Sequence, residues 1–153
     1  MGQIDIGIPI EIVPMELRHI PALAQLERLC FSQPWSENSL NSELTNQLAF
    51  FLVAQQCQNI AGYAGMQCVA GECYMYNVAV FPEYRGNGIG TKLVQALIDK
   101  AIQMDAAFIT LEVRQSNRQA ISVYQKLGFQ KAGCRKNFYA APTEDGFIMT
   151  KTF

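Results

Sequence analysis

Histidine is scarce in this sequence of 153 residues, and an excess of charge of either sign is missing. The single histidine, His19, excludes the metal sites that two or three histidines build. Twelve Lys and Arg residues against thirteen Asp and Glu residues give a net charge of −1. A protein that binds a nucleic-acid backbone needs a basic excess to displace counterions. We therefore expect neither a metal nor a direct nucleic-acid partner.

The cysteines also lack the pattern of a disulfide framework or a zinc site, because their number is odd and no C-x-x-C pair occurs. A disulfide framework or a zinc knuckle needs even, patterned spacing. We expect reduced, mostly buried thiols in a cytoplasmic protein at Cys30, Cys57, Cys68, Cys73 and Cys134.

Signals for secretion or membrane insertion are also missing. The first residues lack a basic segment followed by a long apolar one, which argues against a signal peptide. Residues 44–71 carry no charge, but glutamines, asparagines and glycines interrupt them. This pattern favours two paired strands over a membrane helix.

What the sequence does have is enough apolar material for a core. Apolar residues make up 50% of the chain, charged residues 16%, and the mean hydropathy is +0.05. This composition excludes a disordered chain, and the length favours one domain over residues 1–153, with residues 1–7 loose.

Hydrophobic periodicity predicts an alternating order of strands and helices. The expected strands are residues 8–13, 50–55, 60–68, 73–81, 108–113, 130–139 and 146–152. The expected helices are residues 19–30, a short segment capped by Ser36, a four-turn segment over 89–102, and residues 120–127 with a stop at Gly128. Strand, helix and strand over 73–113 form a βαβ unit with two parallel strands. We expect an α/β (α+β) fold whose mixed sheet is mainly antiparallel.

The most informative segment is YRGNGIG, residues 84–90, between an expected strand and an expected helix. Glycines at alternate positions allow a tight turn and let a ligand approach the backbone. The free N–H groups and the positive end of the helix dipole then favour a phosphate or diphosphate. A glycine-rich helix start without a ligand is the alternative.

Two common nucleotide motifs do not match this loop. A Walker A motif needs G-K-[ST] after four intervening residues, whereas Gly90 is followed by Thr91 and Lys92. The dinucleotide fingerprint G-x-G-x-x-G begins at Gly86, but Thr91 stands at its third glycine.

Arg85-x-x-Gly88-x-Gly90 is similar to the acetyl-CoA loop R/Q-x-x-G-x-G/A of the GNAT N-acetyltransferases. The segments NVAVFPEY and LEVRQSNRQAISVYQKLGF resemble the family's neighbouring motifs in order and spacing. CFSQPWSE, RKNFY and EDGFIM add a resemblance to the RimI type, the ribosomal-protein-alanine N-acetyltransferases. The likeness extends from residue 10 to the end of the chain.

The resemblance implies a GNAT fold with splayed parallel strands that bind acetyl-CoA. Backbone groups of Val78, Ala79 and Val80 would bind the pantetheine arm as an added strand. Arg85 belongs to the same loop motif, and Ser116-x-x-Gln119 is expected to cap the next helix, leaving Asn117 for the cofactor. The main-chain N–H groups expected to bind the diphosphate belong to Gly86, Asn87, Gly88, Ile89, Gly90 and Thr91.

Two residues are candidates for proton transfer. Glu112 interrupts an apolar strand, which is costly for a carboxylate unless it is paired or useful. Its residue type alone leaves open an ion pair with Arg114, and the resemblance implies a general base. Tyr124 is either a core aromatic residue or, as the resemblance implies, the general acid that protonates the leaving thiolate.

The resemblance also implies an acceptor groove walled by Trp35 and Tyr139. Phe138 and Gly146 stand where the motifs more often have Tyr and Ala. The implied reaction moves acetyl from acetyl-CoA to the N-terminal amine of a protein, an alanine of a small-subunit ribosomal protein. Acetylation of a small amine or a lysine side chain, and a CoA-binding subunit without chemistry, remain alternatives. His19 is expected at the surface.

Overall fold

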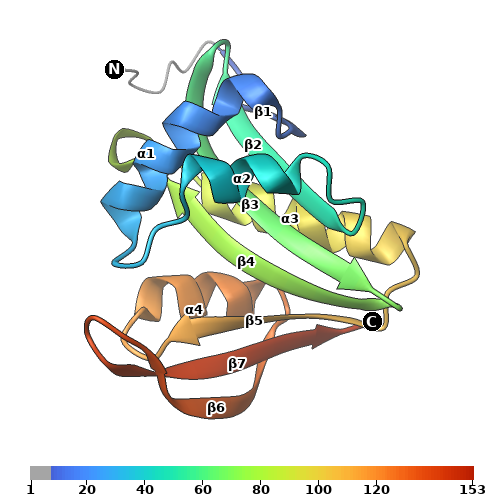
Figure 1. Ribbon diagram of the computed structural model, residues 1–153. Helices are drawn as coiled ribbons and strands as arrows, with labels where there is room; N and C mark the ends of the chain where they lie inside the picture. Colours follow the sequence, from blue (N-terminus) through green and yellow to red (C-terminus); the bar gives the residue numbers. More distant parts are fainter. Residues whose placement is uncertain (1–7) are drawn as a thin grey trace.

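The structure is a computed structural model that describes residues 8–153 (Figure 1). The expected looseness of residues 1–7 lies outside this range. The strands are β1 (Glu11–Pro14), β2 (Ala49–Gln56), β3 (Asn59–Val69), β4 (Glu72–Val80), β5 (Phe108–Arg114), β6 (Gln130–Tyr139) and β7 (Glu144–Thr152). The helices are α1 (Ile20–Cys30), α2 (Glu37–Glu43), α3 (Ile89–Gln103) and α4 (Arg118–Lys126), with 3-10 turns at Leu17–His19 and Pro82–Tyr84.

The expected order of strands and helices is confirmed, and the main differences are at element ends. The first strand begins at Glu11 rather than residue 8, because its register with β2 covers only Glu11–Pro14. The last strand begins at Glu144, two residues earlier than expected. Ser36 caps α2 by accepting a hydrogen bond from the Ser39 N–H at 3.1 Å, as the sequence predicts.

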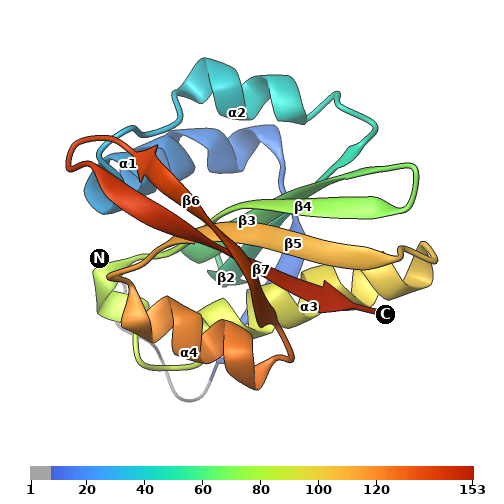
Figure 2. The same ribbon diagram turned by 90° about the horizontal axis from the view of Figure 1, so that it is seen from below.

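Within residues 8–153 the seven strands form one sheet in the order β1-β2-β3-β4-β5-β7-β6. The neighbours β4 and β5 are parallel and the other pairs are antiparallel, which confirms the mixed, mainly antiparallel sheet. Helices α1 and α2 cover one face of this sheet, and α3 and α4 lie on the other (Figures 1 and 2).

The parallel pair separates soon after it starts. β4 and β5 are in register only from Glu72 opposite Phe108 to Tyr74 opposite Thr110. The next part of β4 contains a β-bulge, in which Tyr76 and Asn77 together face the single residue Gly65 of β3. A bulge bends its strand and increases the local twist. Figure 1 shows β4 and β5 diverging from their common start.

The long helix α3 buries most of its expected apolar stripe against the sheet. Ile89, Leu93, Val94, Leu97, Ile98 and Ala101 are each at most 2% exposed. Ile102, expected on the same stripe, is 52% exposed, because the stripe turns away from the sheet in the last helical turn. None of the helices within residues 8–153 is long and apolar enough to cross a membrane.

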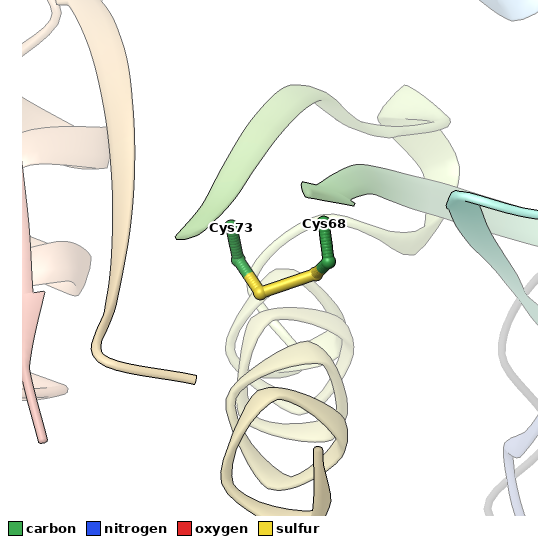
Figure 3. The surroundings of a disulfide bond; sticks show 2 residues. All are labelled: Cys68 and Cys73. Atoms are coloured by element: carbon green, nitrogen blue, oxygen red, sulfur yellow. A yellow bond between two sulfur atoms is a disulfide. The ribbon is translucent and has the colours of Figure 1, made fainter. Parts of the chain in front are cut away.

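The cysteine expectation is wrong in part. Cys68 and Cys73 are buried as expected but form a disulfide across the β3–β4 hairpin, above α3 (Figure 3). The hairpin register sets these two residues directly opposite each other, which their spacing in the sequence does not reveal. Cys57 and Cys134 are exposed rather than buried.

The surface position expected for His19 is also wrong, because its exposure is 0%. Its Nδ1 accepts a hydrogen bond from the Glu16 N–H at 2.9 Å, and its Nε2 lies 3.2 Å from Oε1 of Gln55 on β2. Burial lowers the pKa of His19 below 6.5.

Candidate active site

A cavity of about 500 Å³ opens where β4 and β5 have separated. Four parts of the chain line it: the end of β4, the glycine loop with the start of α3, the face of α4 that carries Tyr124, and the end of α1. Most of the residues that the sequence assigns to the cofactor therefore meet around one cavity, although they come from separate segments. Glu112, Trp35 and Tyr139 do not line this cavity and lie beyond it.

The glycine loop has the geometry that an anion site requires. Gly86 and Gly88 have φ values of 80° and 73°, which residues with a side chain rarely adopt. Gly88 is the N-cap of α3 and no side chain caps this helix, so its first N–H groups keep their donor capacity. Asn87 uses its side-chain amide to hold the loop, donating to the Tyr84 and Arg85 carbonyls at 3.0 and 3.1 Å. These donors and the positive end of α3 suit a diphosphate.

The end of β4 offers a second kind of binding surface. Val78, Ala79 and Val80 pair with β3 on one side, and their other edge has no strand partner because β5 has moved away. All three residues line the cavity. An unpaired edge binds an extended amide-containing chain as an added strand, and the pantetheine arm of coenzyme A is such a chain. The residues present therefore fit the cofactor.

Arg85 spans the space between this edge and α1. Its Nε donates to the Val80 carbonyl at 2.9 Å, and its Nη2 lies 3.3 Å from Sγ of Cys30. Arg85 thus fixes the junction between β4 and the glycine loop, and it also lines the cavity.

Tyr124 lies on α4, lines the cavity, and is 9% exposed. Its ring packs edge-on against Phe129 at 5.7 Å. Burial, and after it the charge of Tyr139, raise the pKa of Tyr124 to about 12. The phenol therefore keeps its proton at neutral pH and is able to donate it.

Glu112 lies on β5, with 32% of its side chain exposed. The ion pair with Arg114 that its residue type left open does not form: Glu112 Oε1 lies 3.4 Å from Nε of Arg135 on β6. Arg114 instead contacts Glu144 Oε1 at 3.2 Å, because β5 and β7 run side by side there. Burial and the Glu112 charge raise the pKa of Tyr139 to about 12, which places this carboxylate within electrostatic range of Tyr139.

The expected capping box of α4 is wrong. Asn117 is the N-cap, and its Oδ1 accepts a hydrogen bond from the Ala120 N–H at 3.2 Å. The Ser116 N–H donates to Glu144 Oε2 at 2.7 Å, which holds Ser116 outside the helix. Asn117 still lines the cavity, and its amide nitrogen is available to a ligand there.

Trp35 lies on the loop between α1 and α2, which meets a second loop, residues 140–143, directly after Tyr139. Trp35 stands between α1 and α2, and its ring packs against Tyr76 at 5.2 Å. Tyr139 ends β6, with the Arg114 guanidinium 4.5 Å above its ring. Ser32, in the first loop, donates to the Ala140 carbonyl of the second loop at 3.5 Å.

Gly146 explains how the two aromatic residues at the end of β6 pack so closely on β7. A Cβ atom at this position would lie 3.1 Å from Cε2 of Tyr139 and 3.3 Å from Cδ2 of Phe138. An alanine here would press on both rings, so glycine and the two aromatic residues form a matched set.

The sequence interpretation missed Glu27 as a residue of the site. It is a carboxylate on the buried stripe of α1 with an exposure of 0%, and its partners include the backbone of Trp35. The signal that was available is a charged residue at a helical position surrounded by apolar ones. Within residues 8–153, no group of three His, Cys, Asp or Glu side chains is arranged to hold a metal ion.

Known proteins of similar sequence and structure agree with this geometry. Residues 20–129 match the family described as acetyltransferase (GNAT) family. A relative from Bacillus subtilis, named putative [ribosomal protein bS18]-alanine N-acetyltransferase, is 37% identical over 90% of this chain and 92% of its own. The crystal structure of the ribosomal-protein-S18-alanine N-acetyltransferase from Escherichia coli superposes with a TM-score of 0.87 at 33% identity, covering 94% of each chain.

The fold is also shared with a protein solved with its cofactor. Arabidopsis thaliana NAA60 in complex with acetyl-CoA superposes with a TM-score of 0.88 at 15% identity, covering 95% of this chain and 99% of the other. At this identity the likeness concerns the fold alone.

Proposed function

The chain belongs to the acetyltransferase (GNAT) family and is an acetyl-CoA-dependent N-acetyltransferase, and from this premise we propose that its acceptor is the N-terminal alanine of ribosomal protein bS18. The names of its relatives from Bacillus subtilis and Escherichia coli support this acceptor. We further propose that the reaction takes place in the cytoplasm and involves no nucleic-acid or membrane partner.

The observation that carries the proposal is the continuous path from the glycine loop to Tyr124. The diphosphate end of the cofactor would lie at the start of α3, and the arm would follow the free edge of Val78–Val80. The reactive end would then lie near the buried phenol, at the place where the acceptor loops begin.

The proton transfers follow from the two candidate residues. An α-amine has a pKa of about 7.7–8.0 and is mostly protonated at neutral pH. Glu112 takes a proton from this amine, directly or through a water molecule, and the free amine attacks the thioester carbonyl. The C–N bond forms, the C–S bond breaks, and the Tyr124 hydroxyl gives its proton to the departing thiolate. The attacking nitrogen then loses its second proton, which restores the Tyr124 phenol. Alignment of the two substrates supplies a further part of the rate.

The proposal is tested by acetyl transfer from acetyl-CoA to three groups of acceptors. These are peptides with the N-terminal sequence of bS18, the same peptides with a blocked α-amine and a free lysine, and small polyamines. We expect acetyl only on the free α-amine of the first group. Preferred acetylation of lysine or polyamines would contradict the proposed acceptor, and CoA binding without transfer to any acceptor would favour a non-catalytic subunit.

A further inference from the structure

The side chain of Glu27 is a buried carboxylate that the proton transfers above do not use. It projects from α1, is 0% exposed, and does not line the cofactor cavity. Three donors surround it: the Trp35 N–H at 2.9 Å from Oε1, the Tyr63 hydroxyl at 2.7 Å from Oε2, and the Asn77 amide at 3.1 Å from both oxygens. Burying a carboxylate is costly unless hydrogen bonds compensate, and here every partner is a donor.

Two of these donors belong to the two surfaces that must face each other during the reaction. Trp35 lies in the acceptor loop between α1 and α2, and Asn77 lies in the β4 bulge, immediately before the cofactor edge at Val78. Oε1 of Glu27 accepts from both and so bridges the loop to the bulge. The Trp35 ring adds a second contact to the same bulge, because it packs on Tyr76 at 5.2 Å.

We propose that Glu27 is a positioning residue that fixes the distance between the acceptor wall at Trp35 and the cofactor edge of β4. The inference deepens the proposed function and rests on it. Glu27 acts through Trp35 and Asn77, since its burial keeps it away from both substrates. An amine and a thioester react only when they are closely aligned, and displacement by about 1 Å costs up to about 100-fold in rate.

The acceptor loop, rather than β4, is the part that would move without this bridge. β4 is held by pairing with β3 on both sides of the bulge. Residues 32–35 have fewer attachments, namely the Ser32 hydroxyl to the Ala140 carbonyl at 3.5 Å, the Trp35 N–H to Glu27, and the Trp35 ring contacts. Loss of the bridge should therefore weaken acceptor alignment and leave cofactor binding intact.

The central test compares Glu27→Gln and Asn77→Ala with the wild type. Glu27→Gln replaces one carboxylate oxygen with an NH2 group, which then faces groups that are themselves hydrogen-bond donors. Asn77→Ala removes the β4 end of the bridge. We expect kcat/KM for the acceptor peptide to fall about tenfold or more in each variant. CoA affinity by calorimetry should stay within about twofold, because the glycine loop is untouched. Trp35 is the only tryptophan in the chain, so a red shift of its fluorescence would report that the loop has moved.

Tyr63→Phe is the matched control, since it removes a bond to Oε2 of the same carboxylate and keeps the bridge through Oε1. It should lower the melting temperature without changing the peptide kcat/KM or the Trp35 emission. The double variant Glu27→Gln, Asn77→Asp exchanges donor and acceptor across the bridge, and we expect it to recover most of the lost kcat/KM.

A purely structural role would give a different pattern. If Glu27→Gln and Asn77→Ala lower only the melting temperature and keep wild-type kcat/KM and emission, the proposal is wrong. Should Glu27→Gln fail to fold, Asn77→Ala decides by itself, because it leaves the carboxylate two of its donors. Failure of the wild type to acetylate any peptide would instead overturn the proposed function, while the emission shifts would still test the bridge.

Discussion

Tyr124 is 9% exposed, whereas Glu112 keeps 32% of its side chain in contact with solvent. A buried phenol with a raised pKa holds its proton and suits the role of acid. A carboxylate that remains partly hydrated, with the largely exposed Arg135 beside it, is able to receive the proton of an incoming amine. The two environments thus favour opposite proton-transfer roles.

Glu112→Gln removes the proposed proton acceptor and keeps the shape of the side chain. We expect kcat to fall about 100-fold, because general-base catalysis contributes this order of rate, while CoA affinity measured by calorimetry stays unchanged. Glu11→Gln, on the distant strand β1, serves as the control with unchanged kcat. Full activity of the Glu112 variant would remove this residue from the mechanism.

Tyr124→Phe removes the proposed proton donor. Because the pKa of Tyr124 is about 12, the wild-type phenol stays protonated up to about pH 10 and the acid remains available. The wild-type rate should therefore rise as the acceptor amine loses its proton and then stay level to about pH 10, and the variant should be about 100-fold slower throughout. Measurement of kcat from about pH 6 to 10 checks this, and a wild-type decline centred near pH 9 would argue against Tyr124 as the acid.

His19 makes the stability of the fold sensitive to pH. Burial lowers its pKa in the folded state below the unfolded value of 6.5, so the unfolded chain binds the proton first as the pH falls. Neutral His19 therefore contributes fully to the free energy of unfolding above pH 6.5. This contribution is lost as the pH falls toward the pKa of His19 in the folded state. Asparagine keeps an acceptor for the Glu16 N–H, so His19→Asn should fold and flatten this dependence. Urea unfolding at about pH 5.5 and 7.5 measures the slope, and equal slopes in both proteins would exclude His19 as its source.

Single residues differ in how well the sequence predicts them. Glu112 stands out because a carboxylate in an apolar strand is unusual. Tyr124 does not, because a tyrosine on an apolar stripe is ordinary core material, and only the family resemblance implied its role. The role of Asn117 was misjudged because two neighbouring residues, Ser116 and Asn117, can both cap a helix, and a distant carboxylate, Glu144, decides between them. Glu27 was missed because its three partners come from distant segments.

The elements that carry the site are the strand β4, the glycine loop and the helix α3. The spacing of apolar residues changes clearly from that of a strand to that of a helix along these elements. This change predicts the ends of α3 closely. The sequence contains no comparable signal for the bulge at Tyr76 and Asn77. The bulge arises because the pairing of β3 with β4 is offset by one residue between its two ends. The splay of β4 from β5 was implied by family resemblance and not by periodicity.

Gly88→Ala tests the loop as a unit. Alanine at a φ of 73° is strained by roughly 1–2 kcal/mol, and relief of this strain would turn the first N–H groups of α3 away from the diphosphate. We expect CoA affinity to fall about tenfold or more, as measured by calorimetry. Gly71→Ala is the matched control, because Gly71 has a φ of 80° and open space around it but lies in the β3–β4 turn. Equal loss of CoA affinity in both variants would show that the effect is general destabilisation.

The molecule as a whole consists of two sheet segments joined over a short length. β1–β4 form one segment and β5–β7 the other, and the register between β4 and β5 extends over only three residue pairs. The two segments remain joined at one end and diverge toward the other (Figure 1). The cavity lies where they have diverged. This arrangement gives one cofactor access to donors from both segments.

A crystal structure with bound CoA tests the central claim most directly. We predict that the diphosphate contacts main-chain N–H groups within residues 86–91, that the pantetheine arm hydrogen-bonds to the backbone of Val78–Val80, and that the sulfur lies within hydrogen-bonding distance of the Tyr124 hydroxyl. CoA bound outside the space between β4 and β5, or with its sulfur remote from Tyr124, would contradict the account.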